Sequence, residues 1–365
     1  MKLYWKKNET YLYMLLVCSF ISFNFLPINI VYPFGALLIF SGIISLLQKK
    51  LVMKKITAIT IIFITVFSVS QSIGLLYNPG KNITILPVII FIYSWVISIF
   101  ILETPPIIDK EQRKKIYIKV LHLSIIFFII ELLTRISIYQ EDKTFLYSFK
   151  KSLLYFDSNF AGLVIISILS FSFYLKKRLL LNINKEIIIL TLLAFLTMSR
   201  GAMFVAILLP FLFLGRYFKI KLILSLIIVL STFTYMATNY ILMDTNYVSI
   251  DGSFNSKFYI LKKSLYFFES LPMESKLFGI GLGNTESSIN IYAHNIIATL
   301  LLEFGIIGSL LFLLFIIYSV IKSKCYSLFI WVPTIIAGIS LFGAYSPFIF
   351  IINSVILFEE NNNEK

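Results

Sequence analysis

The stretch NIIATLLLEFGIIGSLLFLLFIIYSV, residues 295–320, decides the fold class because it is long, apolar and almost free of charge. A helix needs roughly 20 consecutive apolar residues to cross a hydrocarbon core about 30 Å thick. A membrane β-barrel would instead show segments of about ten residues in which apolar and polar residues alternate. The run LLFLLFII at 310–317 does not alternate. The stretch therefore predicts a membrane-spanning α-helix.

Stretches of the same kind recur along the whole chain. Hydrophobic residues make up 59% of the 365 residues, charged residues only 14%, and the mean hydropathy is +0.90. These values lie outside the composition of soluble globular domains. We predict an all-α, polytopic transmembrane bundle that forms a single integral membrane domain over residues 1–365. About twelve spans are expected, at 11–26, 28–47, 56–77, 83–102, 116–135, 159–175, 186–199, 202–215, 222–238, 295–320, 326–345 and 347–358.

The basic residues predict the orientation of these spans. With a cytoplasmic N-terminus, the loops on that side include QKKLVMKK (48–55), KKR (176–178), RYFKIK (216–221) and KSK (322–324). That side then holds about two thirds of the 32 Lys and Arg residues, in line with the positive-inside rule. Both termini are therefore expected in the cytoplasm, and the long segments 136–158 and 239–293 are expected as external (periplasmic) loops. The same topology accounts for the formal charge of +14 without nucleic acid, which would need a soluble basic face.

Ionisable residues at membrane depth are costly, so each one is a candidate functional residue. Arg200 lies in TMSRGA (197–202), where Gly201 permits a break between two spans. Its guanidinium suits phosphate oxygens, and snorkelling to the interface is the alternative. Glu131 and Arg135 are spaced i,i+4 and share one helix face. They form either a structural ion pair or an anion site in which Glu131 orients Arg135.

A further group of candidates lies between Leu277 and Gly308. It combines a Gly-rich turn, a histidine-asparagine pair and an acidic residue within a span, in the segments LFGIGLGN (277–284), YAHN (292–295) and LLEFGIIG (301–308). With an ordinary pKa of about 6.5, His294 could act as a base, a donor or a phosphate ligand. His122, the other histidine, lies in an apolar span and is expected to be a hydrogen-bonded packing residue.

No metal and no nucleotide cofactor are expected. Two histidines, two separated cysteines and no tight carboxylate cluster do not supply a convincing set of metal ligands. The sequence contains no Walker loop, so ATP use has no support. The energy for a reaction must then come from the substrate or from a gradient.

Several of these segments together resemble the bacterial O-antigen polymerases and ligases, membrane enzymes that transfer glycans from a polyprenyl pyrophosphate carrier. The resemblance covers roughly residues 150–315, and its motifs follow the order of the family. They are FDSNFAG (156–162), which opens a span, TMSRGA, which ends one, LFGIGLGN before the histidine-asparagine pair, and LLEFGIIG in the following span. The five N-terminal spans match only in being hydrophobic.

The resemblance implies a metal-independent glycosyltransferase of the bacterial inner membrane whose active face is periplasmic. A sugar hydroxyl attacks the anomeric carbon of a glycan linked to undecaprenyl pyrophosphate, and pyrophosphate leaves. On the family's motifs, Arg200 and His294 are the expected catalytic residues, with His294 as base or anchor. We predict pyrophosphate or glycan binding by Arg135, Lys257, Asn159, Asn295 and Glu303. The implied partners are the lipid-linked oligosaccharide, membrane lipid and a chain-length regulator protein.

The sequence differs from the family at one position that bears on these residues. One group of candidates also has a purely structural explanation. Family members often carry an arginine some twenty residues before the Gly-rich turn, where this chain has Lys257, Lys262 and Lys263. Lysine supplies the charge without the bidentate fork of arginine, and Arg135 could compensate. The polar residues Asp157 to Asn159 could also serve only as a helix N-cap.

Three functions remain open from the sequence. The first is a polymerase of O-antigen or capsule repeat units, which we favour because the loop 239–293 is modest and the apolar content is very high. The second is the ligase that moves finished glycan to lipid A-core. The third, from a different class, is a transporter or flippase of lipid-linked oligosaccharide, for which charges should line a path at mid-membrane.

Overall fold

The computed structural model describes residues 2–21, 29–47, 53–80, 83–139, 149–155, 157–213, 217–243, 252–292, 295–341 and 347–362. These residues are almost entirely helical, and within them the only extended pairing is a single bridge between Lys151 and Asp157. The predicted all-α class is confirmed. The helices are α1 (Lys2–Phe20), α2 (Val31–Leu47), α3 (Lys55–Leu76), α4 (Leu86–Glu103), α5 (Lys110–Ser137), α7 (Ser158–Leu179), α8 (Asn184–Leu196), α9 (Arg200–Phe213), α10 (Phe218–Met243), α11 (Gly252–Ser270), α12 (Met273–Phe278), α13 (Thr285–Ile289), α14 (Ile296–Ala298), η1 (Thr299–Phe304), α15 (Gly305–Lys322), α16 (Leu328–Gly338) and α17 (Phe348–Asn362).

Six helical stretches of the described chain are long and apolar enough to cross a membrane. They are α3, α4, α5, α7, most of α10, and the continuous stretch from α14 through α15. Shorter apolar helices lie at Val31–Ile44, Arg200–Phe213 and Leu328–Gly338. Each of the twelve predicted spans overlaps a helix. The structure thus supports several membrane crossings, while the number twelve stays a prediction.

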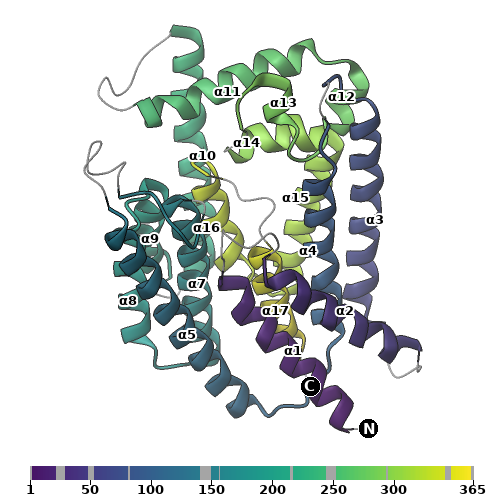
Figure 1. Cartoon of the computed structure of the whole chain (residues 1–365), viewed down its shortest axis with the longest axis vertical. Coiled ribbons are helices and arrows are strands. Elements are labelled where there is room, and N and C mark those ends of the chain that lie inside the picture. The colour runs from purple at the N-terminus through teal and green to yellow at the C-terminus, as the bar shows by residue number, and fades with distance from the viewer. Residues whose placement is uncertain are drawn as a thin grey trace.

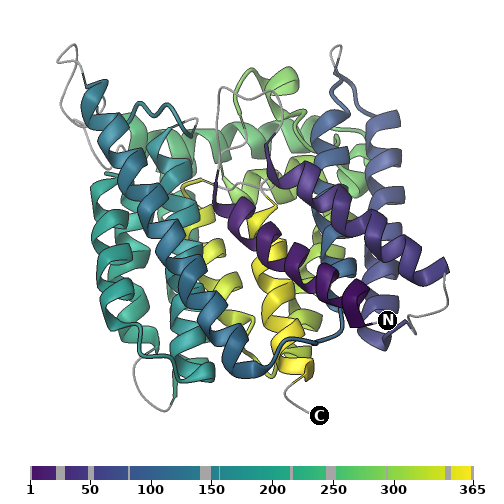
Figure 2. The ribbon, with the colours of Figure 1, turned by 60° about the horizontal axis from the view of Figure 1, so that its bottom comes forward.

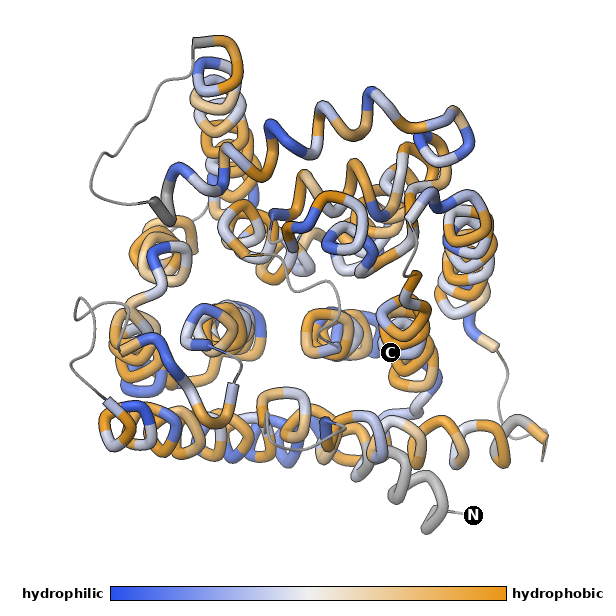
Figure 3. Tube along the Cα trace, turned by 45° about the horizontal axis from the view of Figure 1, so that its top comes forward, coloured by the Kyte–Doolittle hydropathy of each residue, from blue (hydrophilic) through white to orange (hydrophobic). Residues whose placement is uncertain are grey.

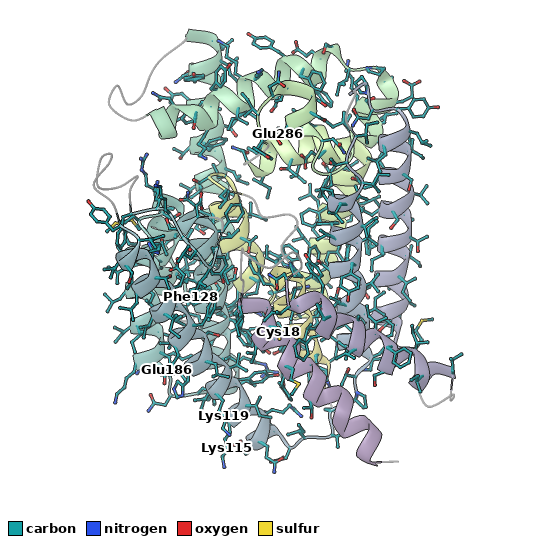
Figure 4. All side chains as sticks on the ribbon, viewed as in Figure 1. Cys18, Lys115, Lys119, Phe128, Glu186 and Glu286 are labelled. Atoms are coloured by element: carbon teal, nitrogen blue, oxygen red, sulfur yellow. The ribbon has the colours of Figure 1, made fainter. Side chains whose placement is uncertain are left out.

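Both ends of the chain lie at one end of the helix bundle, which we call the termini end (Figures 1 and 2). Lys115 and Lys119, in the first turns of α5, lie toward the same end, whereas Glu286 of α13 lies at the opposite end (Figure 4). Hydrophobic residues predominate along most of the helices (Figure 3). Which end faces the cytoplasm is a prediction from the basic loops.

The interior of the bundle is built around α7 and α17. In the most apolar stretch of 18 residues in α7, 89% is buried. This helix is covered because it packs against α8, α9 and α16. In α17, every residue from Phe348 to Glu360 is buried, and this helix packs most extensively on α4. These two helices give the bundle a core on which the outer helices are held.

Two ion pairs with buried carboxylates fasten α17 at the termini end. Arg113 of α5 contacts Glu359 at 2.9 Å, and Arg178 of α7 contacts Glu360 at 2.8 Å. A buried carboxylate without a partner would be strongly destabilising. The two arginines therefore explain how adjacent acidic residues are accommodated in the core.

Most of the described part of the segment predicted at 239–293 is helical, and the Gly-rich turn at 279–284 separates α12 from α13. The helix α11 runs across the end of the bundle opposite the termini, above α13 and α14 (Figure 1). Its inner residues Phe258 and Leu261 pack on Phe233 and Ala237 of α10. The helix α11 thus covers this end of the bundle, and the external position of the segment stays a prediction.

Candidate functional site

A cavity of about 600 Å³ lies among α7, α9, α10, α11 and α16. Its walls are mostly apolar, and its charged lining residues are Lys150, Asp157, Arg200 and Lys257. Three cations therefore share one cavity with one carboxylate. The remaining lining residues are Asn159, Phe160, Gly201, Phe204, Ile228, Val229, Thr232, Phe233, Met236, Phe258, Ile336, Ile339, Ser340 and Leu341.

Arg200 is positioned by a tight reversal between α8 and α9. Met198 in this reversal has a φ of 54°, which is uncommon for a residue other than glycine. The hydroxyl of Thr197 donates to the carbonyl of Ala194 at 2.7 Å and accepts the amide of Ser199 at 3.2 Å. These bonds end α8 and start α9 at Arg200, so the guanidinium is presented at the first turn of a helix.

Close packing fixes α9 on both sides of Arg200. A Cβ atom on Gly162 of α7 would lie only 2.8 Å from the Cβ of Ala202, and one on Gly201 would lie 3.3 Å from that of Ser340. The glycines of FDSNFAG and TMSRGA thus let α7, α9 and the end of α16 approach one another. Two motifs of the family resemblance are therefore explained by helix packing at the cavity wall.

Lys150 and Asp157 are brought together by a short closed loop. Lys151 pairs with Asp157 in the isolated bridge, and the amide of Ser158 donates to the carbonyl of Lys150 at 3.0 Å. The loop closes just before α7 begins. It delivers one cation and one carboxylate to the same cavity.

Asp157 is the N-cap of α7. One carboxylate oxygen, Oδ1, accepts the amides of Asn159 at 2.8 Å and Phe160 at 3.2 Å. The other, Oδ2, accepts the side-chain amide of Asn159 at 3.3 Å. Asn159, a predicted substrate-binding residue, thus lines the cavity and also steadies the carboxylate beside it.

Lys257 reaches the cavity from the inner face of α11. Its neighbour Phe258 is held by stacking on Phe233 of α10, with ring centroids 5.4 Å apart. Burial lowers the pKa of Lys257, the nearby charges of Lys150 and Arg200 lower it further, and Asp157 opposes the shift. The cations are therefore close enough to repel one another, and an anion in the cavity would relieve that repulsion.

Arg135, predicted as an anion ligand, lies outside the cavity lining and is fully buried in an ion pair. Its Nε lies 2.9 Å from Glu131, and both side chains are 1% exposed. One guanidinium nitrogen donates to the carbonyl of Leu196 at 3.1 Å, at the end of α8. Glu131 also accepts the hydroxyl of Ser152 at 2.9 Å. The pair thus connects the reversal before Arg200 with the loop that carries Lys150 and Asp157.

Glu303 and Asn295 are likewise buried outside the cavity lining. Glu303 accepts the hydroxyl of Thr285 at 2.8 Å. Asn295 caps α14 by accepting the amide of Ile297 at 2.7 Å, and it donates to the carbonyl of Ile339 at 3.0 Å. Since Ile339 lines the cavity, Asn295 acts on the cavity wall rather than inside it.

The Gly-rich turn docks on a broken helix instead of lining the cavity. The stretch from 299 to 304 is a π-helix, and Gly305 follows it with a φ of 67°. This break allows the carbonyl of Leu302 to accept the amide of Ile280 at 2.8 Å. A Cβ on Gly305 would lie 2.2 Å from the amide nitrogen of Gly279, so the approach requires glycine.

His294, the predicted base or anchor, lies outside the described residues, and its role stays a prediction. His122 is hydrogen-bonded as expected, at 2.8 Å from Glu186. Its side chain is 53% exposed, however, so the expectation of a packing residue is wrong. The face of α5 that carries His122 and Leu123 points away from the bundle.

Sequence reasoning did not single out Lys150, and it treated Asp157 only as a cap. Neither residue lies in a predicted span, so hydropathy gave no signal for them. The clue was the basic run from Lys150 to Lys151 in a segment expected on the outer side, seven residues before a helix N-cap. Within the described residues, no three His, Cys, Asp or Glu side chains form a group that could hold a metal ion.

The apolar helices and the cavity lined by three cations are the features of a multi-pass α-helical membrane protein with a cationic cavity. Residues 186–313 match the family model described as O-Antigen ligase. This match confirms the resemblance to the O-antigen polymerase and ligase family, whose members are membrane glycosyltransferase-like enzymes. It spans α8 to α15 and therefore includes Arg200, Lys257 and the Gly-rich turn. No curated protein matches the chain.

Proposed function

We propose that this protein is a polymerase that joins repeat units of O-antigen or of a capsular polysaccharide. It transfers glycan from an undecaprenyl pyrophosphate donor to the end sugar of another lipid-linked unit, on the periplasmic face of the inner membrane. The proposal rests on one observation above all. Lys150, Arg200 and Lys257 converge in one cavity within a chain that matches the O-Antigen ligase family.

The three cations suit a pyrophosphate leaving group. As the bond between the sugar and the pyrophosphate breaks, negative charge grows on the phosphate oxygens. Preorganised donors that face this developing charge lower the barrier, and the loss of one such donor typically costs 10²–10³ in rate. Arg200 can supply a bidentate contact, whereas the two lysines act as point charges.

The apolar walls suit the lipid part of the donor. The cavity is lined from α10 by Ile228, Val229 and Phe233. In the most apolar stretch of 18 residues in this helix, only 17% is buried. One side of α10 therefore borders the cavity and much of the rest is open to lipid. A polyprenyl chain can lie along such a helix while its charged head meets the cations.

The placement of the charges favours glycan transfer over transport. Lys150, Asp157 and Arg200 all lie at or just before helix starts, and α7 runs from this level to Arg178, which pairs with Glu360 at the termini end. The cavity charges therefore gather at the opposite end of the bundle. A translocation path would place charges along its length.

Purified protein tests the proposal directly. The full chain in lipid nanodiscs is incubated with undecaprenyl pyrophosphate-linked repeat units from its native glycan, without nucleotide. A polymerase produces a ladder of longer lipid-linked glycans. Transfer only to added lipid A-core identifies a ligase, and glycan translocation without any transfer identifies a flippase. Gene loss gives an independent answer, because a polymerase mutant keeps single repeat units on its lipopolysaccharide and a ligase mutant has bare core.

A further inference from the structure

Asp157 presents a problem for a site that only binds an anion. It is the one carboxylate among the described residues that line the cavity, and it lies beside the three cations. A negative charge at this position weakens pyrophosphate binding by electrostatic repulsion. A neutral Asn caps a helix about as well as Asp does. The cap and donor binding therefore do not explain the charge of Asp157, which in the empty cavity also favours the charged form of Lys257.

The cap leaves the carboxylate with capacity for a further partner. Both backbone amides of the cap go to Oδ1, and Oδ2 accepts only the longer contact from the Asn159 side chain among the described hydrogen bonds. An ionised carboxylate offers about four acceptor positions. Oδ2 can thus accept a hydroxyl proton while Oδ1 holds the group in place.

We propose that Asp157, instead of His294, is the general base that accepts the proton of the acceptor sugar hydroxyl, which leaves His294 the alternative predicted role of an anchor. This inference rests on the proposed glycan transfer and adds a catalytic residue to it. The acceptor oxygen forms a bond to the anomeric carbon as its proton moves to Oδ2 of Asp157. The bond between that carbon and the pyrophosphate oxygen breaks, and the electron pair leaves with the pyrophosphate, next to Arg200 and Lys257. Asp157 later releases the proton to water.

The position of Asp157 gives this assignment a physical basis. A base must lie near the acceptor hydroxyl, while the cations must lie near the leaving group. Asp157 lies just before α7, while Arg200 and Lys257 reach the same cavity from α9 and α11. Positioned bases contribute about 10²–10⁴ in rate.

The test uses Asp157→Asn in the full-length protein. This substitution keeps the cap and the size of the side chain but removes the base. We expect the elongation rate to fall at least about 100-fold. The affinity for undecaprenyl pyrophosphate without glycan, measured as competitive inhibition or by direct binding, should be unchanged or higher. The matched control is Asp109→Asn, the same change at the N-cap of α5, where Asp109 accepts the amide of Glu111 outside the cavity; its rate should equal that of the wild type.

Two results would overturn the inference. A wild-type elongation rate in Asp157→Asn would mean that the residue only caps α7. A parallel loss of rate and of undecaprenyl pyrophosphate binding would mean that the carboxylate organises the cations instead of accepting a proton. The proposed function is judged separately, from the products of the wild-type protein, so a failure of one is distinguishable from a failure of the other.

Discussion

Arg135 and Glu131 form a buried ion pair, with 2.9 Å between the guanidinium and the carboxylate, and this pair joins two of the three segments that carry the charges of the cavity. Arg135 binds the carbonyl of Leu196, four residues before Arg200. Glu131 binds Ser152, which lies between Lys150 and Asp157. The pair therefore fixes the position of Arg200 relative to the loop before α7.

Breaking this pair should destabilise the protein. Glu131→Gln leaves the Arg135 guanidinium buried without a counter-ion, and such losses cost about 3–5 kcal/mol. We expect a clearly lower midpoint of thermal unfolding in detergent.

Replacing the pair with apolar residues separates stability from positioning. In the double variant Glu131→Leu/Arg135→Met, no uncompensated charge remains, so most of the stability should return. Glycan transfer should stay impaired, because the contacts to Leu196 and Ser152 are still missing. Full activity in the stable double variant would show that the pair has only a structural role.

Removing the Arg200 guanidinium should impair transfer far more than folding. We expect Arg200→Ala to lower kcat/KM about 10²–10³-fold, and Arg200→Lys to recover part of this loss because lysine restores charge without the fork. Steady-state elongation assays measure both effects. The control is Lys114→Ala, which removes a cation paired with Glu111 near the termini end; an equal loss in that variant would contradict a specific role for Arg200.

Lys257 should make donor binding depend on pH. The pKa of this lysine is lowered in the empty cavity by burial and by the neighbouring cations. A bound pyrophosphate favours the charged form and raises the pKa, so binding is strongest below the pKa of the empty state and weakens as pH rises through that of the bound state. Binding of undecaprenyl pyrophosphate, measured over a pH series, should show this decline.

The variant Lys257→Arg provides the matched comparison for that series. Arginine stays charged over the accessible pH range. Its binding curve should therefore lose the decline at high pH. Identical curves for the wild type and the variant would assign the pH dependence to another group.

Glycine at position 305 should be essential for assembly of the end of the bundle that α11 covers. Gly305→Ala places a Cβ 2.2 Å from the amide nitrogen of Gly279 and demands a positive φ from alanine. We expect poor folding yield and increased proteolysis between α11 and α15. Gly80→Ala is the control, because the nearest atoms to its Cβ are side-chain oxygens, at 3.0 Å and beyond; similar damage in that variant would contradict the close approach.

The helices were predictable because apolar runs of span length have few alternatives in lipid. Arg200 was predictable because a charge at the end of an apolar run is conspicuous. Arg135 and Glu303 drew attention for the same reason, yet the structure buries both among partners that hydropathy cannot reveal. Lys150 depends on a loop closed by a bridge to a residue near the start of α7, and such a pairing has no periodic signal.

The docking of the Gly-rich turn has a consequence for building chimaeras of related proteins. The Gly-rich turn lies within the matched segment 186–313, but two residues that precede this segment hold it in place. Gln71 accepts the amide of Leu282 at 3.0 Å, and Asn78 donates to the carbonyl of Ile280 at 2.6 Å. The matched segment is therefore not a transplantable module. A chimaera that exchanges the first helices between related proteins must therefore keep both amide side chains. Without them, the Gly-rich turn of the recipient loses these two hydrogen bonds.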